Sequence, residues 1–392
     1  MKKQLLTTTA LVAAGVLVVS GPALAGKPKL TVGGGVAQIV GVGSNSDAFD
    51  AANGGRVGFD QHSDAEIHFN GSVTLDNGIK IRTRIELEGN SADSVAGRNS
   101  NVTNGPPGGT QSPDYIDEHW MRISGSFGEV RLGSHDPAAQ AMTTGYLATW
   151  NTNVGLNLAF DTSDWVSNPG TVGASTVGRI DVTSDAESVS YFTPRFSGFQ
   201  VGVSWTPSGR EDVNNQRELE AGADTEGRTI GVNYSTKMGG VGVAVAAGYA
   251  TAEESTANRS NPEVMGGGVR LDFSGIRLSA SYVDKGDQTV NGVTSSARGW
   301  GQKTYELGAK YTMGPNAMSI AHLSSETQAT SQALGDGDTA KVTFISYRRT
   351  LGPGVSWTLT GIHADFDDNA AGATAATSND GKALVTAINV RF

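Results

Sequence analysis

The sequence predicts an all-β fold, a closed barrel of sixteen antiparallel strands that crosses a membrane. Three observations predict this fold. Many segments of about ten residues alternate apolar and polar side chains, which is the period of a strand with two different faces. Short turns alternate with long polar connections, as in a barrel with its turns on one side of a membrane and its loops on the other. After residue 25, no apolar run approaches the ~20 residues that a membrane-spanning helix needs.

The first 25 residues are predicted to be a secretory signal peptide. Two lysines precede an apolar stretch at residues 11–19, and small residues follow at 23–25. This is the pattern of a charged start, a hydrophobic centre and a cleavage site, so cleavage is expected after about Ala25. Residues 26–392 are expected to form a single barrel, because no linker or change of composition divides them.

The clearest strand covers residues 79–88. One face of it carries five charged side chains and the other face none, which is a strong period-two pattern. The preceding strand, residues 66–75, is joined to it by Asp76, Asn77 and Gly78, residue types that favour the backbone angles of a tight turn. The two segments are therefore predicted to form a hairpin. Its charged face consists of Lys80, Arg82, Arg84, Glu86 and Glu88.

The same strand–turn–strand unit recurs along the chain. Together with a first and a last strand, these hairpins give an even number of strands, which places both termini on the periplasmic side of a barrel. The further predicted strands are 30–42, 114–124, 129–135, 187–193, 199–206, 226–236, 240–250, 263–273, 276–285, 302–312, 317–325, 340–350, 355–366 and 382–392.

Composition excludes several classes of protein. The formal net charge is −10, and the predicted signal peptide contains lysines but no acid, so nucleic acid is not an expected partner. The chain has no cysteine, and its histidines do not form a pair at the spacing of a zinc-binding helix. We therefore predict no enzyme, no metal site and no cofactor. The acidic external loops, including Asp367 and Asp368, leave open a loosely bound divalent cation such as calcium.

Two segments carry a more specific resemblance. Residues 120–133, WMRISGSFGEVRLG, are similar to a strand–turn–strand segment of Gram-negative general diffusion porins. Residues 188–199, SVSYFTPRFSGF, are similar to the hairpin that follows the constriction loop of these porins. The chain also ends on an aromatic residue, Phe392, which resembles the signal that the outer-membrane barrel-assembly machinery recognises. The resemblance covers essentially the whole mature chain.

The resemblance implies a homotrimer of water-filled barrels in the cell outer membrane, in contact with lipopolysaccharide and lipid. Such barrels pass ions and small hydrophilic solutes by passive diffusion. It also implies that the third external loop, here residues 136–186, folds into the lumen and narrows the pore. This connection is the longest in the chain and is too apolar for a freely solvated loop; it contains Trp150, Leu156, Leu158, Phe160 and Trp165.

The predicted site is a constriction between a basic wall and this loop. If the apolar faces of the strands point to lipid, their charged faces point into the lumen. Basic residues opposite an acidic loop would create a transverse field that orients dipolar solutes. The residues predicted for the basic wall are Lys80, Arg82, Arg84, Arg122 and Arg131, and those predicted for the acidic loop are Asp161 and Asp164.

Two other functions stay open at this point. A substrate-specific channel of the same architecture, for a sugar or an anion, would show saturable block by one solute. An outer-membrane barrel enzyme or an adhesin would show negligible conductance, with hydrolysis or cell binding instead. Nothing in the local sequence singles out a serine, a histidine and an acid as a catalytic set.

Overall fold

The computed structural model describes residues 26–55, 58–89, 116–155, 158–170, 172, 174–209, 224–255, 257–290, 293–295, 301–327, 337–369 and 373–392. The predicted signal peptide, residues 1–25, lies outside the described residues.

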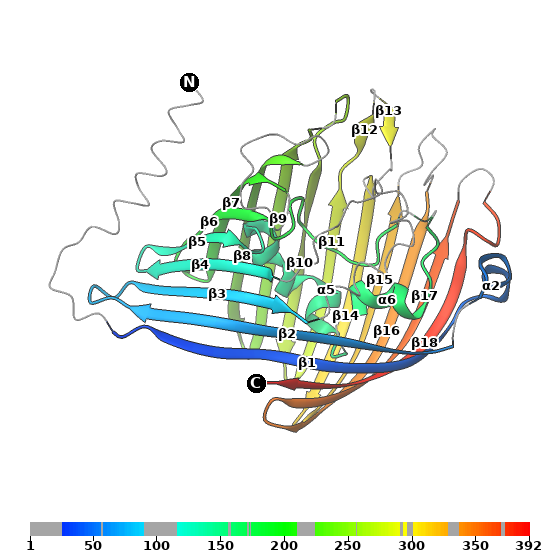
Figure 1. The fold of residues 1–392 in the computed structure, drawn as a ribbon, viewed down its shortest axis with the longest axis horizontal. Helices are drawn as coiled ribbons and strands as arrows, with labels where there is room; N and C mark the ends of the chain where they lie inside the picture. Colours follow the sequence, from blue (N-terminus) through cyan, green and yellow to red (C-terminus); the bar gives the residue numbers. More distant parts are fainter. Residues whose placement is uncertain are drawn as a thin grey trace.

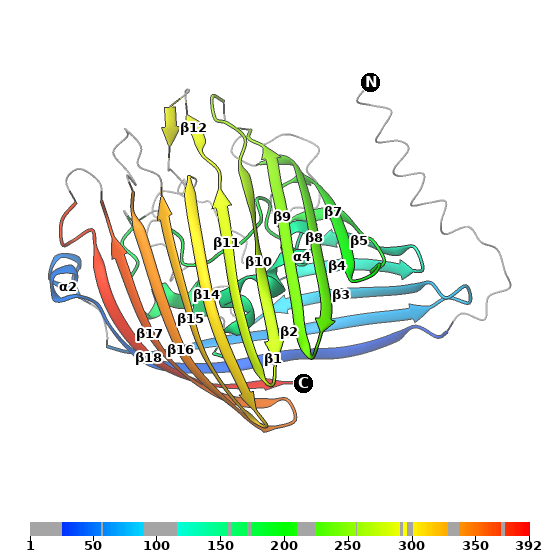
Figure 2. The same ribbon diagram turned by 180° about the vertical axis from the view of Figure 1, so that it is seen from behind.

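In the described part of the chain, sixteen antiparallel strands close into one barrel, which confirms the predicted fold (Figures 1 and 2). Each strand pairs with its neighbours in the chain, and the first strand pairs with the last. The strands are β1 (Lys29–Ser44), β2 (Phe59–Thr74), β3 (Lys80–Glu88), β4 (Ile116–Gly125), β5 (Gly128–Ser134), β6 (Glu187–Phe192), β7 (Phe199–Ser208), β8 (Thr225–Met238), β9 (Val241–Glu253), β10 (Glu263–Phe273), β11 (Ile276–Lys285), β14 (Gln302–Met313), β15 (Asn316–Thr327), β16 (Thr339–Gly352), β17 (Val355–Asp367) and β18 (Asn379–Arg391).

The two faces of the barrel wall differ in the way the alternation predicts. On β15, Met318 and Ile320 are about half exposed on the outer face, whereas Ala317 and Ala321, on either side of this pair in the sequence, are buried on the inner face. Large apolar side chains line the outside of most strands in this way, as a lipid-facing barrel requires. None of the described helices has the length and apolar character of a transmembrane helix.

The barrel closes between β1 and β18. The backbone N–H of Gly34 donates to the carbonyl of Phe392 at 3.1 Å, and the N–H of Phe392 donates to the carbonyl of Gly34 at 3.1 Å. The last residue of the chain is thus hydrogen-bonded to the first strand, and its side chain remains 64% exposed.

The strand β2 starts at Phe59, earlier than the predicted start at residue 66. The added residues pair with β1, but their outward side chains include Gln61 and Ser63, which both donate hydrogen bonds to Gln38. Because these outward positions are polar, the apolar alternation that marks the other strands is missing there. Tight turns follow the prediction more closely, since Gly78 between β2 and β3 has a φ of 81°.

Two small elements outside the barrel wall were not predicted. The helix α2 (Asp47–Asn53) follows β1; the Phe49 N–H donates to the side chain of Ser46 at its start, and Gly54 ends it in the left-handed conformation. A short hairpin of β12 (Gln288–Val290) and β13 (Val293–Ser295) extends the connection between β11 and β14 (Figure 1).

Candidate functional site

A folded segment occupies the inside of the barrel. We call residues 135–186, which connect β5 to β6, the inner segment. It contains α4 (Ala138–Thr143), a 3-10 turn η2 (Thr144–Tyr146), α5 (Ala148–Thr152) and α6 (Leu158–Trp165). The helices lie within the ring of strands (Figures 1 and 2): α4 packs against β7, β8 and β9, α5 against β11, β14 and β15, and α6 against β1.

Small side chains on the wall let the inner segment approach closely. On β9 every inward residue from Gly242 to Ala252 is glycine or alanine. A β-carbon at Gly268 would collide with the carbonyl oxygen of Tyr146, and one at Gly308 would collide with the side chain of Thr152. The helices of the inner segment therefore rest directly on the strand backbone.

Hydroxyl groups of the wall cap the helices of the inner segment. Neither α4 nor α5 has a side-chain cap of its own, because Pro137 and Leu147 precede them. The first N–H of α4, on Ala138, donates instead to Ser204 Oγ at 2.6 Å, and the first N–H of α5, on Ala148, donates to Ser281 Oγ at 2.8 Å. Wall side chains thus satisfy backbone donors that a short helix leaves unpaired.

One buried carboxylate joins two parts of the inner segment to the wall. Glu306 on β14 is 1% exposed and accepts hydrogen bonds from Thr149 Oγ1 at 2.9 Å, Thr149 N–H at 3.3 Å and Gly178 N–H at 3.1 Å. It also accepts from Ser281 Oγ at 2.6 Å. Thr149 lies in α5, whereas Gly178 lies on the returning part of the segment, so Glu306 fixes both.

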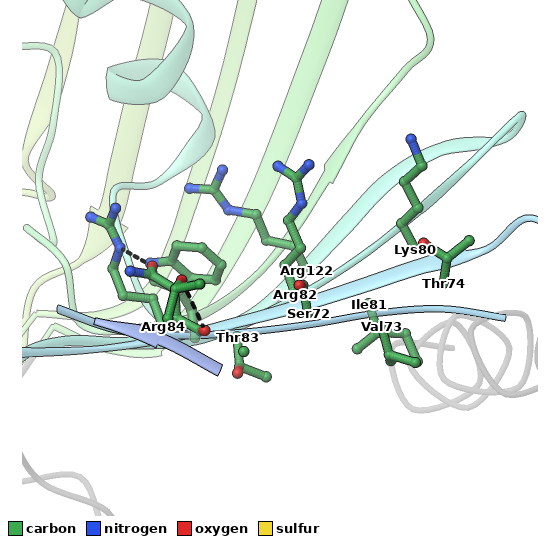
Figure 3. Close-up of a pocket in the computed structure, with 13 residues that line it drawn as sticks. Ser72, Val73, Thr74, Lys80, Ile81, Arg82, Thr83, Arg84 and Arg122 are labelled. Atoms are coloured by element: carbon green, nitrogen blue, oxygen red, sulfur yellow. Dashed lines mark hydrogen bonds between the residues drawn. The ribbon is translucent and has the colours of Figure 1, made fainter. Parts of the chain in front are cut away.

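The predicted basic residues lie together on another part of the wall. Figure 3 shows Lys80, Arg82, Arg84 and Arg122 pointing to one side of β3 and β4, into the barrel, while Ile81 points to the opposite side. We call Lys80, Arg82, Arg84, Arg122 and Arg131 the arginine wall. They come from β3, β4 and β5, and the first four line a cavity of about 540 Å³.

Three of these arginines stand in one row across neighbouring strands. Arg82 lies opposite Arg122, and Arg122 lies opposite Arg131. Like charges placed directly across from each other destabilise a sheet unless something compensates them. Among the described residues, Lys80 and Arg82 form no ion pair, so their charges reach the lumen uncompensated by a direct partner.

Aromatic rings and glutamates on the same or the neighbouring strand compensate the other arginines. The guanidinium of Arg122 lies 4.0 Å from the ring centre of Trp120, and that of Arg131 lies 4.7 Å from the ring centre of Phe192. Arg131 pairs with Glu129 at 2.9 Å and Arg84 pairs with Glu86 at 3.0 Å. Sequence analysis did not assign Trp120 or Glu129 to the site. Their signal is the spacing of two residues along one strand face, which places Trp120 beside Arg122 and Glu129 beside Arg131.

The predicted acids of the loop lie elsewhere or outside the described side chains. Asp164 Oδ2 is 3.8 Å from His62 Nδ1, near the place where α6 packs on β1. His62 is about 26 Å along β2 from Asn70, the residue opposite Arg84, at about 3.3 Å per residue. The structure therefore does not bring Asp164 to the arginine wall. Asp161 lies on α6, and its side chain is outside the described residues.

A group of charged residues lies where the inner segment leaves β5. Arg179 is 3.6 Å from Asp181 and donates to Gln140 at 2.7 Å, and Gln140 in turn donates to Asp136. Burial raises the pKa of Asp136 to about 6; Arg179 opposes this shift, whereas Glu118, Asp181 and Asp185 add to it. The hydrogen bonds of Gln140 and Arg179 thus join the start of the inner segment, after β5, to its end, before β6.

A serine and a histidine also meet there, inside the protein. His135 Nδ1 lies 2.7 Å from the Gly133 carbonyl, so it donates, and Nε2 then accepts from Ser190 Oγ at 2.9 Å. Burial, with the nearby charge of Arg131, lowers the pKa of His135 to about 3, which keeps the ring neutral. His135 is 1% exposed and Ser190 0%. The pair links the inner segment to β6 and is shielded from the lumen.

Comparison with known proteins gives one family and a set of related folds. The family model described as Gram-negative porin matches residues 7–369. A refined porin structure is 15% identical and covers 93% of this chain and 100% of its own, with a TM-score of 0.56. The anion-selective porin from Comamonas acidovorans is 16% identical, with coverages of 93% and 100% and a TM-score of 0.55. OmpT, an outer membrane protein of Vibrio cholerae, is 8% identical, with coverages of 95% and 100% and a TM-score of 0.56.

At these low identities the structural likeness shows the fold. Among curated proteins, none matches the chain in sequence.

Proposed function

The chain belongs to the Gram-negative porin family, and from this premise we propose that its arginine wall makes the pore prefer anions. As a porin it is an outer-membrane channel for the passive diffusion of ions and small hydrophilic solutes. The observation that carries the proposal is the row of Arg82, Arg122 and Arg131 across three strands, with Lys80 beside it.

Local charge favours anions at this row. Among the described residues, the acids in direct contact with the arginine wall are Glu86 and Glu129, fewer than the basic residues they face. A surplus of positive charge on a low-dielectric wall raises the local concentration of anions and repels cations. The overall acidity of the chain does not oppose this effect, because charges beyond about 10 Å are largely screened at 0.1 M salt.

The inner segment supplies the narrowing in this proposal. Its helices fill space beside β7–β15 and β1, and the arginine wall lies on β3–β5, so solutes would pass between the two. The sequence predicted acidic residues opposite the basic wall. In our proposal, the polar surface of the inner segment faces the arginine wall across the pore instead. Asp164, beside His62, is too distant to act on solutes at Arg84.

We further propose the assembly that the family resemblance implies. The barrels form a homotrimer in contact with lipopolysaccharide and outer-membrane lipid, and Phe392 acts as the signal to the barrel-assembly machinery. Export removes the signal peptide after about Ala25. We propose neither a catalytic role nor a nucleic-acid partner, and no cofactor is required for diffusion; calcium held loosely by the external acids stays a prediction.

An anion-specific channel is the second candidate, and the same cavity favours it. Lys80, Arg82, Arg84 and Arg122 converge on one space of about 540 Å³, which is large enough for a small multivalent anion. Such a channel would bind one anion and show saturable block of the chloride current. A channel that only enriches anions would show a current that rises linearly with salt concentration.

Planar-bilayer recordings test the proposal. The wild type is compared with the double variant Arg82→Ala/Arg84→Ala under a salt gradient, and the reversal potential gives the permeability ratio. Each charge contributes about 0.5 kcal/mol at roughly 8 Å in water, which screening at 0.1 M salt reduces to about 0.25 kcal/mol. Because the effect has opposite sign for anions and cations, losing two charges should shift the ratio toward cations about fivefold. Conductance that rises in three equal steps, one for each barrel, would support the trimer.

The control for this experiment is Arg228→Ala. Arg228 lies on the outer face of β8 with its side chain 56% exposed, so its loss removes a positive charge without changing the lumen. An unchanged reversal potential in the double variant, or an equal shift in Arg228→Ala, would contradict the anion preference of the arginine wall.

A further inference from the structure

Three potential metal ligands meet on the inner face of β2 and β3, beside the arginine wall. Glu66 and His68 are two residues apart on β2, and Glu86 lies directly opposite His68 on β3. The His68 Nε2 atom is 3.1 Å from Glu66 Oε2 and 3.2 Å from Glu86 Oε1. One donor atom from each of the three side chains lies within 4.8 Å of the others.

His68 Nε2 has too few hydrogens for the two carboxylate oxygens that approach it. One imidazole nitrogen carries at most one hydrogen, yet two carboxylate oxygens approach His68 Nε2 at contact distance. The hydrogen bond has acceptable geometry toward Glu66. Glu86 Oε1 therefore faces a nitrogen whose hydrogen is already directed elsewhere. A cation between the three atoms would satisfy all of them at once.

The spacing of the ligand atoms fits a tetrahedral ion. Zinc binds histidine nitrogen and carboxylate oxygen at about 2.0–2.1 Å, so two ligand atoms on a tetrahedron are about 3.3 Å apart. The two measured separations, 3.1 and 3.2 Å, are close to this edge length. Only a small outward movement of the side chains would admit the ion.

Neighbouring charges support a cation at this place. Glu66 stands directly opposite Glu88 in the strand register, and Glu118 adds negative charge near Glu86. Arg84 holds the second oxygen of Glu86 at 3.0 Å, which leaves Oε1 oriented toward His68. An outer partner that fixes a ligating carboxylate in this way is typical of metal sites.

We propose that Glu66, His68 and Glu86 bind a divalent transition-metal ion, with Zn²⁺ as the best fit. One imidazole and two carboxylates leave a fourth position for water, as in sites with three protein ligands. Calcium is disfavoured because it takes six to eight oxygen ligands. The side chain of Glu66 is 36% exposed, that of His68 18% and that of Glu86 9%, so the ion would enter from the lumen.

Calorimetric titration of Zn²⁺ into the folded mature protein in detergent tests this site. The wild type should bind one Zn²⁺ per chain, and Ca²⁺ should not compete. His68→Ala should weaken binding at least about tenfold. The matched control is His363→Ala, because His363 on the outer face of β17 pairs at 3.1 Å with the single carboxylate of Asp380.

A second variant guards against a folding defect. Glu66→Gln keeps the size of the most exposed ligand and should also weaken Zn²⁺ binding, while heat-modifiable migration in gels confirms that the barrel is folded. The reversal potential of the wild type should move toward anions when Zn²⁺ is added, because the ion adds positive charge next to Arg84. That readout rests on the proposed anion preference, whereas the calorimetry does not.

Three results would overturn the site. They are the absence of saturable binding in the wild type, an equal loss of affinity in His68→Ala and His363→Ala, and Ca²⁺ binding as tight as Zn²⁺ binding.

Discussion

The two sides of the lumen are built from opposite kinds of residue. On β3 the inward side chains are long and charged, and Arg82 reaches into an open cavity. On β9 the inward residues are glycine and alanine, and Ala250 is 0% exposed beneath the inner segment. Both walls come from the same alternating strands. The size of the inward residue thus decides whether a strand is lined by water or by protein.

The two sides also satisfy their polar groups differently. The side under the inner segment offers hydroxyls and one carboxylate to backbone N–H groups, as at Ser204, Ser281 and Glu306. The arginine wall is compensated only in part: Glu86, Glu129 and aromatic rings contact Arg84, Arg122 and Arg131, whereas Lys80 and Arg82 form no ion pair among the described residues. Mutations on the covered side should therefore change stability, and mutations on the arginine wall should change ion selectivity.

We expect the largest loss of stability on the side of the lumen that the inner segment covers from Glu306→Ala. The substitution leaves the N–H groups of Thr149 and Gly178 buried without an acceptor, and each such loss costs about 1–3 kcal/mol. The free energy of unfolding should fall by at least about 2 kcal/mol, measured from the urea midpoint. Channel current should become larger or noisier as α5 leaves the wall.

Glu326→Ala is the control for that change, because Glu326 is an exposed glutamate on the outer face of β15. If Glu306→Ala keeps the wild-type midpoint and current, the inner segment does not depend on this anchor.

A smaller effect is expected from Gly268→Ala. The added methyl group would meet the carbonyl of Tyr146, so η2 must shift away from β10. Overpacking of this kind costs about 1–3 kcal/mol, and the urea midpoint should fall accordingly. In Gly242→Ala, also on an inner face, the methyl group meets its nearest atom at 3.4 Å and should cost little. Equal midpoints in the two variants would show that the close packing at Tyr146 does not contribute to stability.

The smallest effect is expected from Asp136→Asn, at the junction of the two sides. Burial raises the pKa of Asp136 from its usual value of 3.8 to about 6, so the folded protein binds this proton more tightly than the unfolded chain. The free energy of unfolding should therefore fall as pH rises through this window, and the loss is complete above it. Asparagine removes this dependence but can still accept from Gln140.

Urea midpoints measured between pH 4 and pH 7 in both proteins check the Asp136 prediction. The side chain is 40% exposed, so the difference between the curves should be modest. If the urea midpoints of the variant and the wild type change with pH in the same way, Asp136 does not contribute to the pH dependence of stability.

Strands could be predicted where the outward residues are apolar. The interval 79–88 matches β3, Lys80–Glu88, because isoleucines and leucine mark its outer face. The start of β2 was missed because Gln61 and Ser63 stand at outward positions there. The short helices of the inner segment were not predicted, since residues far along the chain, such as Ser204 and Ser281, supply their caps.

The candidate site could be predicted only in part for a similar reason. Alternation alone fixes the inward direction of Arg82, Arg84 and Arg122, and Figure 3 shows these side chains pointing into the barrel. The position of Asp164 depends instead on where α6 packs, at β1, which no local pattern encodes. The helical spacing of zinc ligands, four residues apart, does not reveal Glu66 and His68. These two residues lie on a strand, where side chains two residues apart point to the same side.

The pairing of β1 with β18 has a consequence for the way this barrel folds. The contacts that join β1 to β18 link the two ends of the chain, so they are the most distant in sequence. Long-range pairing slows folding, and until it occurs both terminal strands expose unpaired backbone edges that attract other strands. The seam can close only when β18 is present to pair with β1. A chain truncated before β18 would therefore keep two open edges, and we expect it to aggregate rather than to form a smaller pore.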